Sequence, residues 1–153
     1  MSAVLSQAPA FRPMGSADLT AVLAIEQRIY THPWTLGHFR DSLHAGYSCW
    51  LMECGGDLAG YGVLMTGVGE AHLLNLSVAP DWQGQGLGRS LLHHFIDIAR
   101  SCEARRMFLE VRPSNQAARW LYADTGFREL YVRRGYYPAG AGREDAILMG
   151  IDL

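Results

Sequence analysis

Apolar and polar positions repeat with two different periods along this chain, and the changes of period divide it into predicted helices and strands. Helical spacing runs over 16–30 and resumes after Thr35, where Leu36, Phe39 and Leu43 share one face. Ser16 and Thr35 are suitable N-caps for these two helices, and His32-Pro33-Trp34 separates them. Gly46 is placed to end the second helix.

The most regular helical pattern begins at Leu87. Its apolar stripe consists of residues 91, 92, 95, 98, 99 and 102. Polar residues of the same segment fall on the opposite face, which is typical of a helix packed on a core. We therefore expect Cys102 on the buried face, with no role as a nucleophile. A later helix is predicted from Ser114, as its N-cap, to Thr125, with Gly126 ending it.

Strand patterns occupy most of the remaining chain. The predicted strands are 9–14, 49–53, 58–65, 72–79, 107–111, 127–133 and 146–151. Gly55-Gly56-Asp57 is a hairpin turn signal between two of them, and a polar, glycine-rich loop over 135–145 joins the last two. The order β-α-α-β-β-β-α-β-α-β-β predicts one α/β domain over 1–153, with helices packed on a mixed sheet.

Composition and charge narrow the function classes. Hydrophobic residues make up 49% of the 153 positions and charged residues 18%, and the formal charge is −2. Such values argue against a nucleic-acid or membrane surface. The N-terminus shows neither a secretion signal nor a membrane span, and the three cysteines have no C-x-x-C spacing. We therefore expect a cytoplasmic monomer with reduced thiols and no metal, nucleic-acid or membrane partner.

The clearest chemical signal is N-L-S-V-A-P-D-W-Q-G-Q-G-L-G-R-S at 75–90. An apolar strand ends at Pro80, and glycines at 84, 86 and 88 open the helix that carries Arg89. Backbone N–H groups in such a turn bind anions. The chain contains no lysine, so the turn is no Walker A loop, and its G-x-G-x-G spacing differs from the G-x-G-x-x-G of dinucleotide sites. By itself the turn is a weak anion-binding signal.

Further motifs accompany this turn. Q-G-Q-G-L-G at 83–88 fits a Q/R-x-x-G-x-G/A signature, L-S-V-A-P precedes it, and 115–127 read N-x-x-A-x-x-x-Y-x-x-x-G-F. Over most of the chain these motifs resemble the GNAT family of N-acetyltransferases. H-P-W at 32–34, L-E-V-R at 109–112, R-R-G-Y-Y-P at 133–138 and G-R-E-D-A at 142–146 are similar to its RimI-type branch.

The resemblance implies the GNAT fold, acetyl-coenzyme A as co-substrate, and the N-terminal alanine of a small-subunit ribosomal protein as acceptor. Pantetheine amides are expected to pair with the strand edge at Leu76, Ser77 and Val78 and to bond to Asn115. In the family, the strands that match 73–79 and 107–111 splay apart at this edge. Arg89 either adds charge to the pyrophosphate site or is a solvated helix residue. The expected pyrophosphate site is Gly84, Gln85, Gly86, Leu87, Gly88 and Arg89.

Glu110 and Tyr122 are the catalytic candidates. Glu110 lies within an apolar strand, which is expected to raise its pKa, and the L-E-V match favours a general base over an exposed or ion-paired residue. Tyr122 shares a helical stripe with Asn115 and Ala118, and the match favours a general acid over a core aromatic. An α-amine needs only a modest base, because it is roughly 14% neutral at pH 7 against about 0.04% for a lysine amine.

A cluster of aromatic and charged residues is predicted on the acceptor side. The tyrosines are expected to wall a small first side chain and the acids to hold basic residues of a peptide, with solvated loop chemistry as the alternative. The cluster comprises Arg133, Arg134, Tyr136, Tyr137, Arg143, Glu144 and Asp145, and Tyr30 and Trp34 are expected to line the opposite side. Two other functions stay open: acetylation of a small amine or a lysine side chain, and acyl-coenzyme A binding by a non-catalytic sensor.

Overall fold

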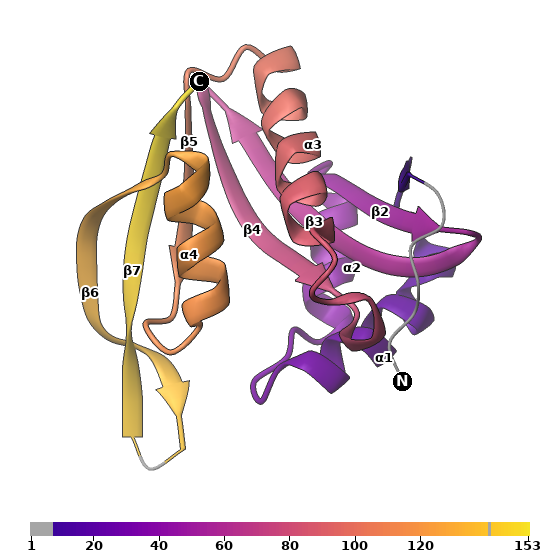
Figure 1. Ribbon diagram of the computed structural model, residues 1–153, viewed down its shortest axis with the longest axis horizontal. Helices are drawn as coiled ribbons and strands as arrows, with labels where there is room; N and C mark the ends of the chain where they lie inside the picture. Colours follow the sequence, from indigo (N-terminus) through magenta and orange to yellow (C-terminus); the bar gives the residue numbers. More distant parts are fainter. Residues whose placement is uncertain (1–7, 141) are drawn as a thin grey trace.

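A seven-stranded mixed sheet runs through the protein in the order β1-β2-β3-β4-β5-β7-β6 (Figure 1). The computed structural model describes residues 8–140 and 142–153. In chain order the elements are β1 (Ala10–Pro13), α1 (Leu19–Ile29), α2 (Leu36–His44), β2 (Ser48–Cys54), β3 (Asp57–Gly67), β4 (Glu70–Val78), α3 (Leu87–Ser101), β5 (Arg106–Val111), α4 (Gln116–Thr125), β6 (Arg128–Ala139) and β7 (Gly142–Asp152). The predicted order of elements and the mixed α/β fold are confirmed.

The sheet separates two hydrophobic cores. One contains the buried residues of α1 and α2, and the other contains those of α3 and α4. Neighbouring residues of one strand alternate between them: Val63 belongs to the α1 and α2 core, and Leu64 to the α3 and α4 core. Because successive strand side chains point to opposite faces, the two helix pairs cover opposite faces of the sheet.

The two N-terminal helices begin in different ways. Thr35 caps α2 as predicted, since its Oγ1 accepts the His38 N–H at 3.3 Å. The prediction that Ser16 caps α1 is wrong, because Ser16 opens a 3-10 turn and α1 starts only at Leu19. The Asp18 carboxylate accepts the Gly15 N–H at 2.8 Å instead. Asp18, the third residue of this turn, thereby closes it on the residue before Ser16.

The end of α3 also differs from the prediction. Cys102 was expected on the buried stripe, but it follows the last residue of α3 and is exposed. The chain turns here because Glu103 takes a left-handed conformation with φ +62°. The Ala104 N–H then bonds to the Ala99 carbonyl at 3.0 Å, which makes a Schellman-type ending. This turn ends the helical periodicity before Cys102 can reach the core.

The C-terminal hairpin is longer than predicted. Residues 135–145 were expected to form a loop, yet β6 and β7 pair until Ala139 faces Gly142. Three residues of β6, 134–136, lie opposite Asp145 alone, and Gly135 in this bulge has φ +59°. The bulge accommodates the extra residues of β6, so the two strands continue to pair on both sides of it, as they do at bulges in other antiparallel sheets.

The sheet opens between β4 and β5. These strands pair in parallel from Glu70 with Arg106 as far as Leu73 with Leu109, and the recorded pairing stops there. Figure 1 shows β4 and β5 diverging beyond this point, with α4 lying over β5. The splay that the resemblance implied is therefore present, and it leaves the second half of β4 with an edge that β5 does not cover.

Leu74 marks the start of this opening. Leu73 pairs with Leu64 and Asn75 pairs with Val63, so Leu74 is an extra residue in β4. Such a bulge shifts the alternation of the strand by one position. Leu73 consequently lies in the core beneath α3, whereas Asn75 and the alternate residue Ser77 turn toward α1.

Candidate active site

A cleft of about 570 Å³ opens where β4 and β5 separate. One wall is formed by α1, the segment after it and β4, and the other by β5, the start of α4 and β6. The predicted residues that line the cleft are Tyr30, Trp34, Leu76, Glu110, Asn115, Tyr122 and Tyr137. The two catalytic candidates therefore share one cavity with only two of the ten predicted coenzyme contacts, Leu76 and Asn115.

Glu110 reaches the cleft through strand alternation. Its neighbours Leu109 and Val111 point into the core beneath α4, so Glu110 points to the opposite face of β5. The side chain is 31% exposed, and its Oε2 lies 4.0 Å from Nη1 of Arg133. Glu110 as a residue is therefore exposed, and the expectation that the apolar residues around it in the sequence would bury it is wrong.

Tyr122 reaches the cleft from α4. The residue is 7% exposed, and burial raises the pKa of its phenol above the ordinary value, with smaller contributions from Tyr30 and Tyr137. Tyr122 consequently stays protonated at neutral pH and can act as a hydrogen-bond donor. Ala118 lies one turn before Tyr122 and lines the same cleft.

The predicted cap of α4 is wrong. Asn115, not Ser114, is the N-cap, because its Oδ1 accepts the Ala118 N–H at 3.2 Å. Ser114 is engaged by Glu144 instead, which accepts its N–H at 2.8 Å and its hydroxyl at 2.9 Å. Because the Ser114 hydroxyl donates to Glu144 of β7, it does not cap α4. Asn115 fixes the first turn of α4 beside the cleft instead.

A buried acid that the sequence analysis missed lies behind the α1 and β4 wall. Glu26 on α1 is 1% exposed. Its Oε1 accepts the Tyr61 hydroxyl at 2.8 Å and Nδ2 of Asn75 at 3.2 Å, and its Oε2 accepts the Trp34 N–H at 2.9 Å. One carboxylate thus joins α1, β3, β4 and the segment before α2. Its position on the apolar stripe after Val22, at helical spacing, was the available signal.

The hydrogen bonds continue from Asn75 to the cleft. Ser77 Oγ donates to Oδ1 of Asn75 at 2.7 Å, and the Tyr30 hydroxyl lies 2.7 Å from Ser77 Oγ. Glu26, Tyr30 and Asn75 all line the cavity. Ser77, predicted to contact the coenzyme through its backbone, therefore uses its side chain on the opposite face of β4.

The glycines of the turn before α3 have separate structural reasons. Gly84 and Gly86 adopt φ +80° and +78°, the left-handed region that side chains disfavour, and Gly86 is the N-cap of α3. Gly88 is helical, and a Cβ there would lie 3.4 Å from Leu121 of α4, so it permits close helix packing. Leu87 is buried, which leaves only its backbone for a ligand.

This turn lies at the end of β4, outside the residues that line the cleft. Gln83 connects the turn to β4, since its Nε2 donates to the Val78 carbonyl at 3.0 Å. Arg89 bonds to Asp124 of α4 at 2.6 Å and lies 5.7 Å from the centre of the Trp120 ring. The predicted phosphate-binding arginine therefore connects α3 to α4.

A second hollow of about 240 Å³ adjoins the cleft on the acceptor side. Trp34, Glu110 and Tyr137 line both cavities, and Tyr136 lines the second alone. Tyr137 packs under Arg112, whose Cζ lies 4.3 Å from the ring centre. Burial, followed by the charge of Glu110, raises the pKa of Tyr137 to about 12. Three predicted aromatic residues thus surround the space beside Glu110.

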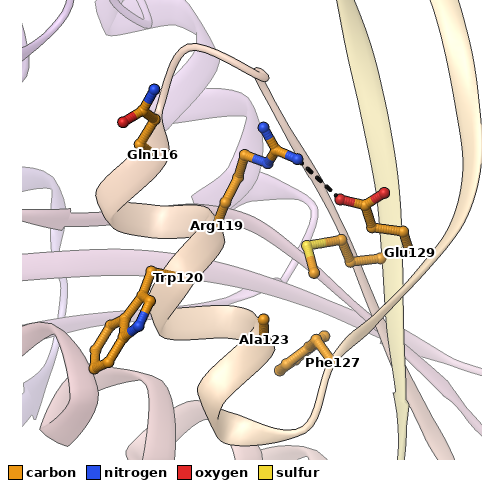
Figure 2. A pocket seen from close by; sticks show the side chains of 7 residues that line it. Gln116, Arg119, Trp120, Ala123, Phe127 and Glu129 are labelled. Carbon is orange, nitrogen blue, oxygen red and sulfur yellow. Dashed lines mark hydrogen bonds and ion pairs between the residues drawn. The ribbon is translucent and has the colours of Figure 1, made fainter.

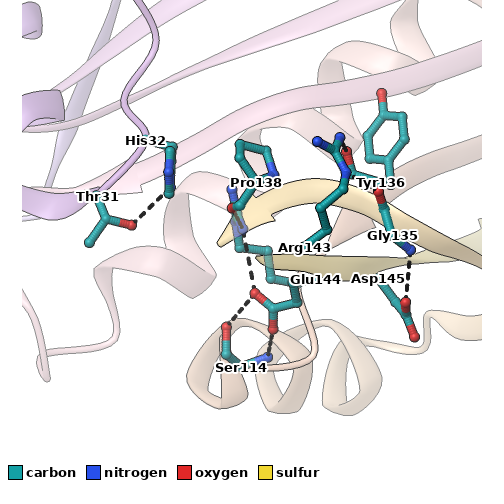
Figure 3. Close-up of polar contacts among 10 residues, drawn as sticks. Thr31, His32, Ser114, Gly135, Tyr136, Pro138, Arg143, Glu144 and Asp145 are labelled. Atoms are coloured by element: carbon teal, nitrogen blue, oxygen red, sulfur yellow. Dashed lines mark hydrogen bonds and ion pairs between the residues drawn. The ribbon is translucent and has the colours of Figure 1, made fainter. Parts of the chain in front are cut away.

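The charged residues predicted for the acceptor side are engaged in the hairpin (Figure 3). The two bonds from Ser114, and then Arg112, lower the pKa of Glu144. Asp145 accepts the Gly135 N–H at 2.9 Å, and Arg134 lies 3.4 Å from the same carboxylate while remaining 87% exposed. Neither cavity is lined by Arg134, Glu144 or Asp145.

A third hollow, of about 380 Å³, lies between α4 and β6 (Figure 2). Its polar lining includes Arg119 and Glu129, which are joined at 3.1 Å. Neither Glu110 nor Tyr122 lines it, so the chemistry expected of this chain is concentrated in the cleft.

Residues 8–140 and 142–153 contain neither a metal-binding group of side chains nor a helix that could span a membrane. Among these residues no three His, Cys, Asp or Glu side chains are grouped to hold a metal ion. Within the same part of the chain, no helix is both long and apolar enough to cross a membrane.

Comparisons with known proteins complete the description of the site. Residues 19–127 match the acetyltransferase (GNAT) family. The chain is 41% identical over 138 residues to the [ribosomal protein bS18]-alanine N-acetyltransferase of Escherichia coli K12. The aligned residues cover 90% of this chain and 93% of that relative. A putative enzyme of the same name from Bacillus subtilis is 34% identical over 146 residues, 94% of this chain and 95% of the relative.

Solved structures agree with these relatives. The crystal structure of the ribosomal-protein-S18-alanine N-acetyltransferase from Escherichia coli has a TM-score of 0.89 at 39% identity and covers 95% of this chain and 94% of its own. The structure of yncA, a putative acetyltransferase from Salmonella typhimurium with its cofactor acetyl-CoA, has a TM-score of 0.80 at 22% identity, covering 96% and 95%. The second likeness shows the fold alone.

Proposed function

We propose that this chain acetylates the N-terminal alanine of a small-subunit ribosomal protein. The premise is that the chain belongs to the acetyltransferase (GNAT) family and is an acetyl-CoA-dependent N-acetyltransferase. The observation that carries this proposal is the 41% identity to the Escherichia coli bS18-alanine enzyme over 90% of the chain. We expect the protein to act as a cytoplasmic monomer.

The family's co-substrate, acetyl-coenzyme A, matches the chemistry of β4 and the turn after it. The first intrahelical bond of α3 runs from Ser90 to Gly86, so the amides of Leu87, Gly88 and Arg89 have no intrahelical partner and can bind a pyrophosphate. The edge of β4 over 76–78, which β5 leaves uncovered, offers peptide groups to the pantetheine amides. Asn115 adds an amide whose Oδ1 already serves α4, so its Nδ2 is the group that meets the coenzyme.

Glu110 is the proposed general base. It takes a proton from the substrate ammonium, directly or through a water, and the neutral amine attacks the thioester carbonyl. The carbonyl carbon gains the C–N bond and then loses the C–S bond. The nitrogen loses its surplus proton, which replaces the one that Tyr122 gives to the thiolate, and Glu110 returns its proton to solvent. Tyr122 faces the departing sulfur in this scheme. Because its pKa is raised above that of an ordinary phenol, Tyr122 stabilises the thiolate first by a hydrogen bond and gives up its proton late.

The acceptor pocket is assigned to the hollow beside Glu110. Trp34, Tyr136 and Tyr137 surround it, which suits a small first side chain such as that of alanine. Glu144 and Asp145 contribute by holding the hairpin against the start of α4 and by fixing the bulge that presents Tyr136. Direct contact of either acid with basic residues of the substrate is a secondary part of the proposal, as is contact of Arg134 with the incoming peptide.

A peptide assay tests the substrate. Release of coenzyme thiol is measured with a peptide of the bS18 N-terminus, the same peptide with a bulky first residue, the same peptide already blocked at its α-amine but containing a lysine, and a free polyamine. The alanine peptide is expected to give the highest kcat/KM. Acetylation of the lysine or polyamine instead would favour the small-amine or lysine function, and tight acetyl-CoA binding without turnover on any amine would favour a sensor.

A further inference from the structure

Tyr30 is a polar residue that lines the cleft and has no role in the reaction scheme. It caps the C-terminal end of α1, lines the cleft and is half-buried. Burial raises the pKa of its phenol to about 12, with a smaller contribution from the charge of Glu26. Tyr30 therefore carries one proton throughout the neutral range, and the group that receives this proton determines what the oxygen offers to a ligand.

The buried hydrogen bonds determine the direction of each donor. Glu26 has two oxygens, and three donors converge on them, among them the backbone N–H of Trp34, which cannot accept. A carboxylate in this position acts as an acceptor, so Asn75 must turn its Nδ2 toward it. Oδ1 of Asn75 then faces Ser77 and has only lone pairs to offer. Ser77 accordingly donates its hydroxyl proton to Asn75 at 2.7 Å.

The same reasoning reaches Tyr30. Because the Ser77 proton is used by Asn75, the 2.7 Å contact between Tyr30 and Ser77 can be a hydrogen bond only if Tyr30 donates. The carbonyl of Leu76, 3.4 Å from the phenol oxygen, is also an acceptor and does not change this direction. A phenol oxygen has one proton and accepts through its lone pairs, so the face of Tyr30 toward the cleft is an acceptor.

We propose that Tyr30 is a substrate-binding residue that accepts a hydrogen bond from the α-ammonium group of the incoming N-terminus, and that Glu26, Asn75 and Ser77 are positioning residues that hold its hydroxyl away from the cleft. The inference rests on the proposed function, since it assigns the partner of the reacting amine. An ammonium group has three donors and no acceptor. It therefore matches a site that contains an oriented acceptor and two acids, Glu26 behind one wall and Glu110 on the other.

The pantetheine arm also carries N–H groups, so the test must separate the two sources. Tyr30→Phe removes the acceptor and keeps the ring. It is measured with the best amine peptide and with a des-amino analogue, identical except that hydrogen replaces the α-amine, as a competitive inhibitor. We expect kcat/KM for the peptide to fall about 10- to 100-fold, the range for a hydrogen bond to a charged group. The inhibition constant of the analogue and the KM for acetyl-CoA should stay within about twofold.

Tyr131→Phe is the matched control, because this tyrosine is 63% exposed on β6 and lines neither cavity around Glu110. Ser77→Ala is a second variant, which keeps the Tyr30 ring and oxygen and removes the acceptor of its proton. The hydroxyl can then turn into the cleft, so the peptide KM should rise, again with little change for the des-amino analogue. Thermal unfolding of each variant confirms that the fold is retained.

Equal losses for the peptide and the analogue would overturn the proposal, because Tyr30 would then act on the shape of the cleft and not on the amine. A rise confined to the KM for acetyl-CoA would overturn it as well and would assign the acceptor to pantetheine. Failure of the alanine substrate is a separate result: if the wild-type chain prefers another amine, the same comparison is made with that amine and its des-amino analogue.

Discussion

The two walls of the cleft hold their acids in different ways. On the α1 and β4 wall, Glu26 is 1% exposed and accepts hydrogen bonds from three elements. On the β5 and β6 wall, Glu110 is 31% exposed, and its recorded ion-pair partner, Arg133, lies 4.0 Å away. An acid whose oxygens accept several hydrogen bonds holds the residues around it in place. An acid that takes a proton from a substrate instead needs an oxygen that can accept that proton. We therefore expect Glu26 to have a structural role and Glu110 to have the proposed chemical one.

Glu110→Gln tests the chemical side of this comparison and has the largest expected effect. Loss of a general base should reduce kcat/KM by roughly 10²- to 10⁴-fold, and the loss should be less severe at high pH, where more of the amine is already neutral. Steady-state rates from pH 6 to 9 measure it. Glu129→Gln, an exposed acid on β6, is the control, and an unchanged rate for Glu110→Gln would remove Glu110 from the mechanism.

Tyr122→Phe tests the other catalytic candidate that lines the cleft. The phenol is proposed to meet the thiolate late in the reaction, so we expect a loss of about 10²-fold in kcat, at the lower end of the range for acid–base catalysis. Binding of acetyl-CoA, measured by calorimetry, should be nearly unchanged because the ring remains. A variant with normal kcat but weak coenzyme binding would show that Tyr122 acts as a packing residue.

Glu26→Gln tests the structural side. The neutral amide cannot accept all three hydrogen bonds, because one end of it is a donor, and an unsatisfied buried group costs about 1–3 kcal/mol. Urea denaturation should show this loss in the free energy of unfolding, while Glu70→Gln, at an exposed strand end, should show none. If Glu26→Gln left stability intact and abolished turnover, the two acids would have exchanged the roles assigned here.

Gly86→Ala extends the test to the turn that follows the β4 wall. A side chain at φ +78° costs roughly 1–2 kcal/mol, and relaxation of the turn should weaken coenzyme binding. Thermal unfolding and the KM for acetyl-CoA measure the two effects. Gly67→Ala is the matched control, because its φ is not positive and a Cβ there meets no atom within 4 Å.

Glu144→Gln is expected to have the smallest effect, and the size of this effect depends on pH. The bonds from Ser114 lower the pKa of Glu144 in the folded state. The stability this carboxylate contributes is therefore fully present above its unfolded pKa of about 4.3 and is lost as the pH falls through the lower folded value. Melting temperatures of wild type and variant should differ at pH 7 and converge in acid. A difference that persisted at low pH would require another cause.

Periodicity and local turn signals were enough to predict the order of the elements. The α2 cap at Thr35 and the end of α4 at Gly126 depend on neighbouring residues, and both are as expected. Ser16 failed as a cap for a local reason, because it opens a 3-10 turn and α1 starts only at Leu19. Ser114 failed because Glu144, from another strand, accepts both its N–H and its hydroxyl. Competition between a local cap and a distant acid cannot be judged from adjacent residues.

The catalytic candidates and the missed network show the same limit. Glu110 and Tyr122 were identified because their motifs match a family, and the structure brings both to one cleft. Glu26 bonds to residues 35 and 49 positions away, Tyr61 and Asn75. Its place on an apolar helix stripe indicated a buried acid, but its partners depend on how β3 and β4 pair. Likewise, the bulge that lets 135–145 form strands is a property of the paired hairpin.

The extra residue Leu74 has a consequence for how this sequence can vary. A substitution there leaves the positions that follow unchanged, so many residue types should be compatible with the fold. A deletion would instead exchange the two faces of the rest of β4, placing Asn75 and Ser77 beneath α3 and turning Leu76 and Val78 toward Glu26. Evolution can therefore alter the identity of residue 74 far more readily than it can alter the length of this strand.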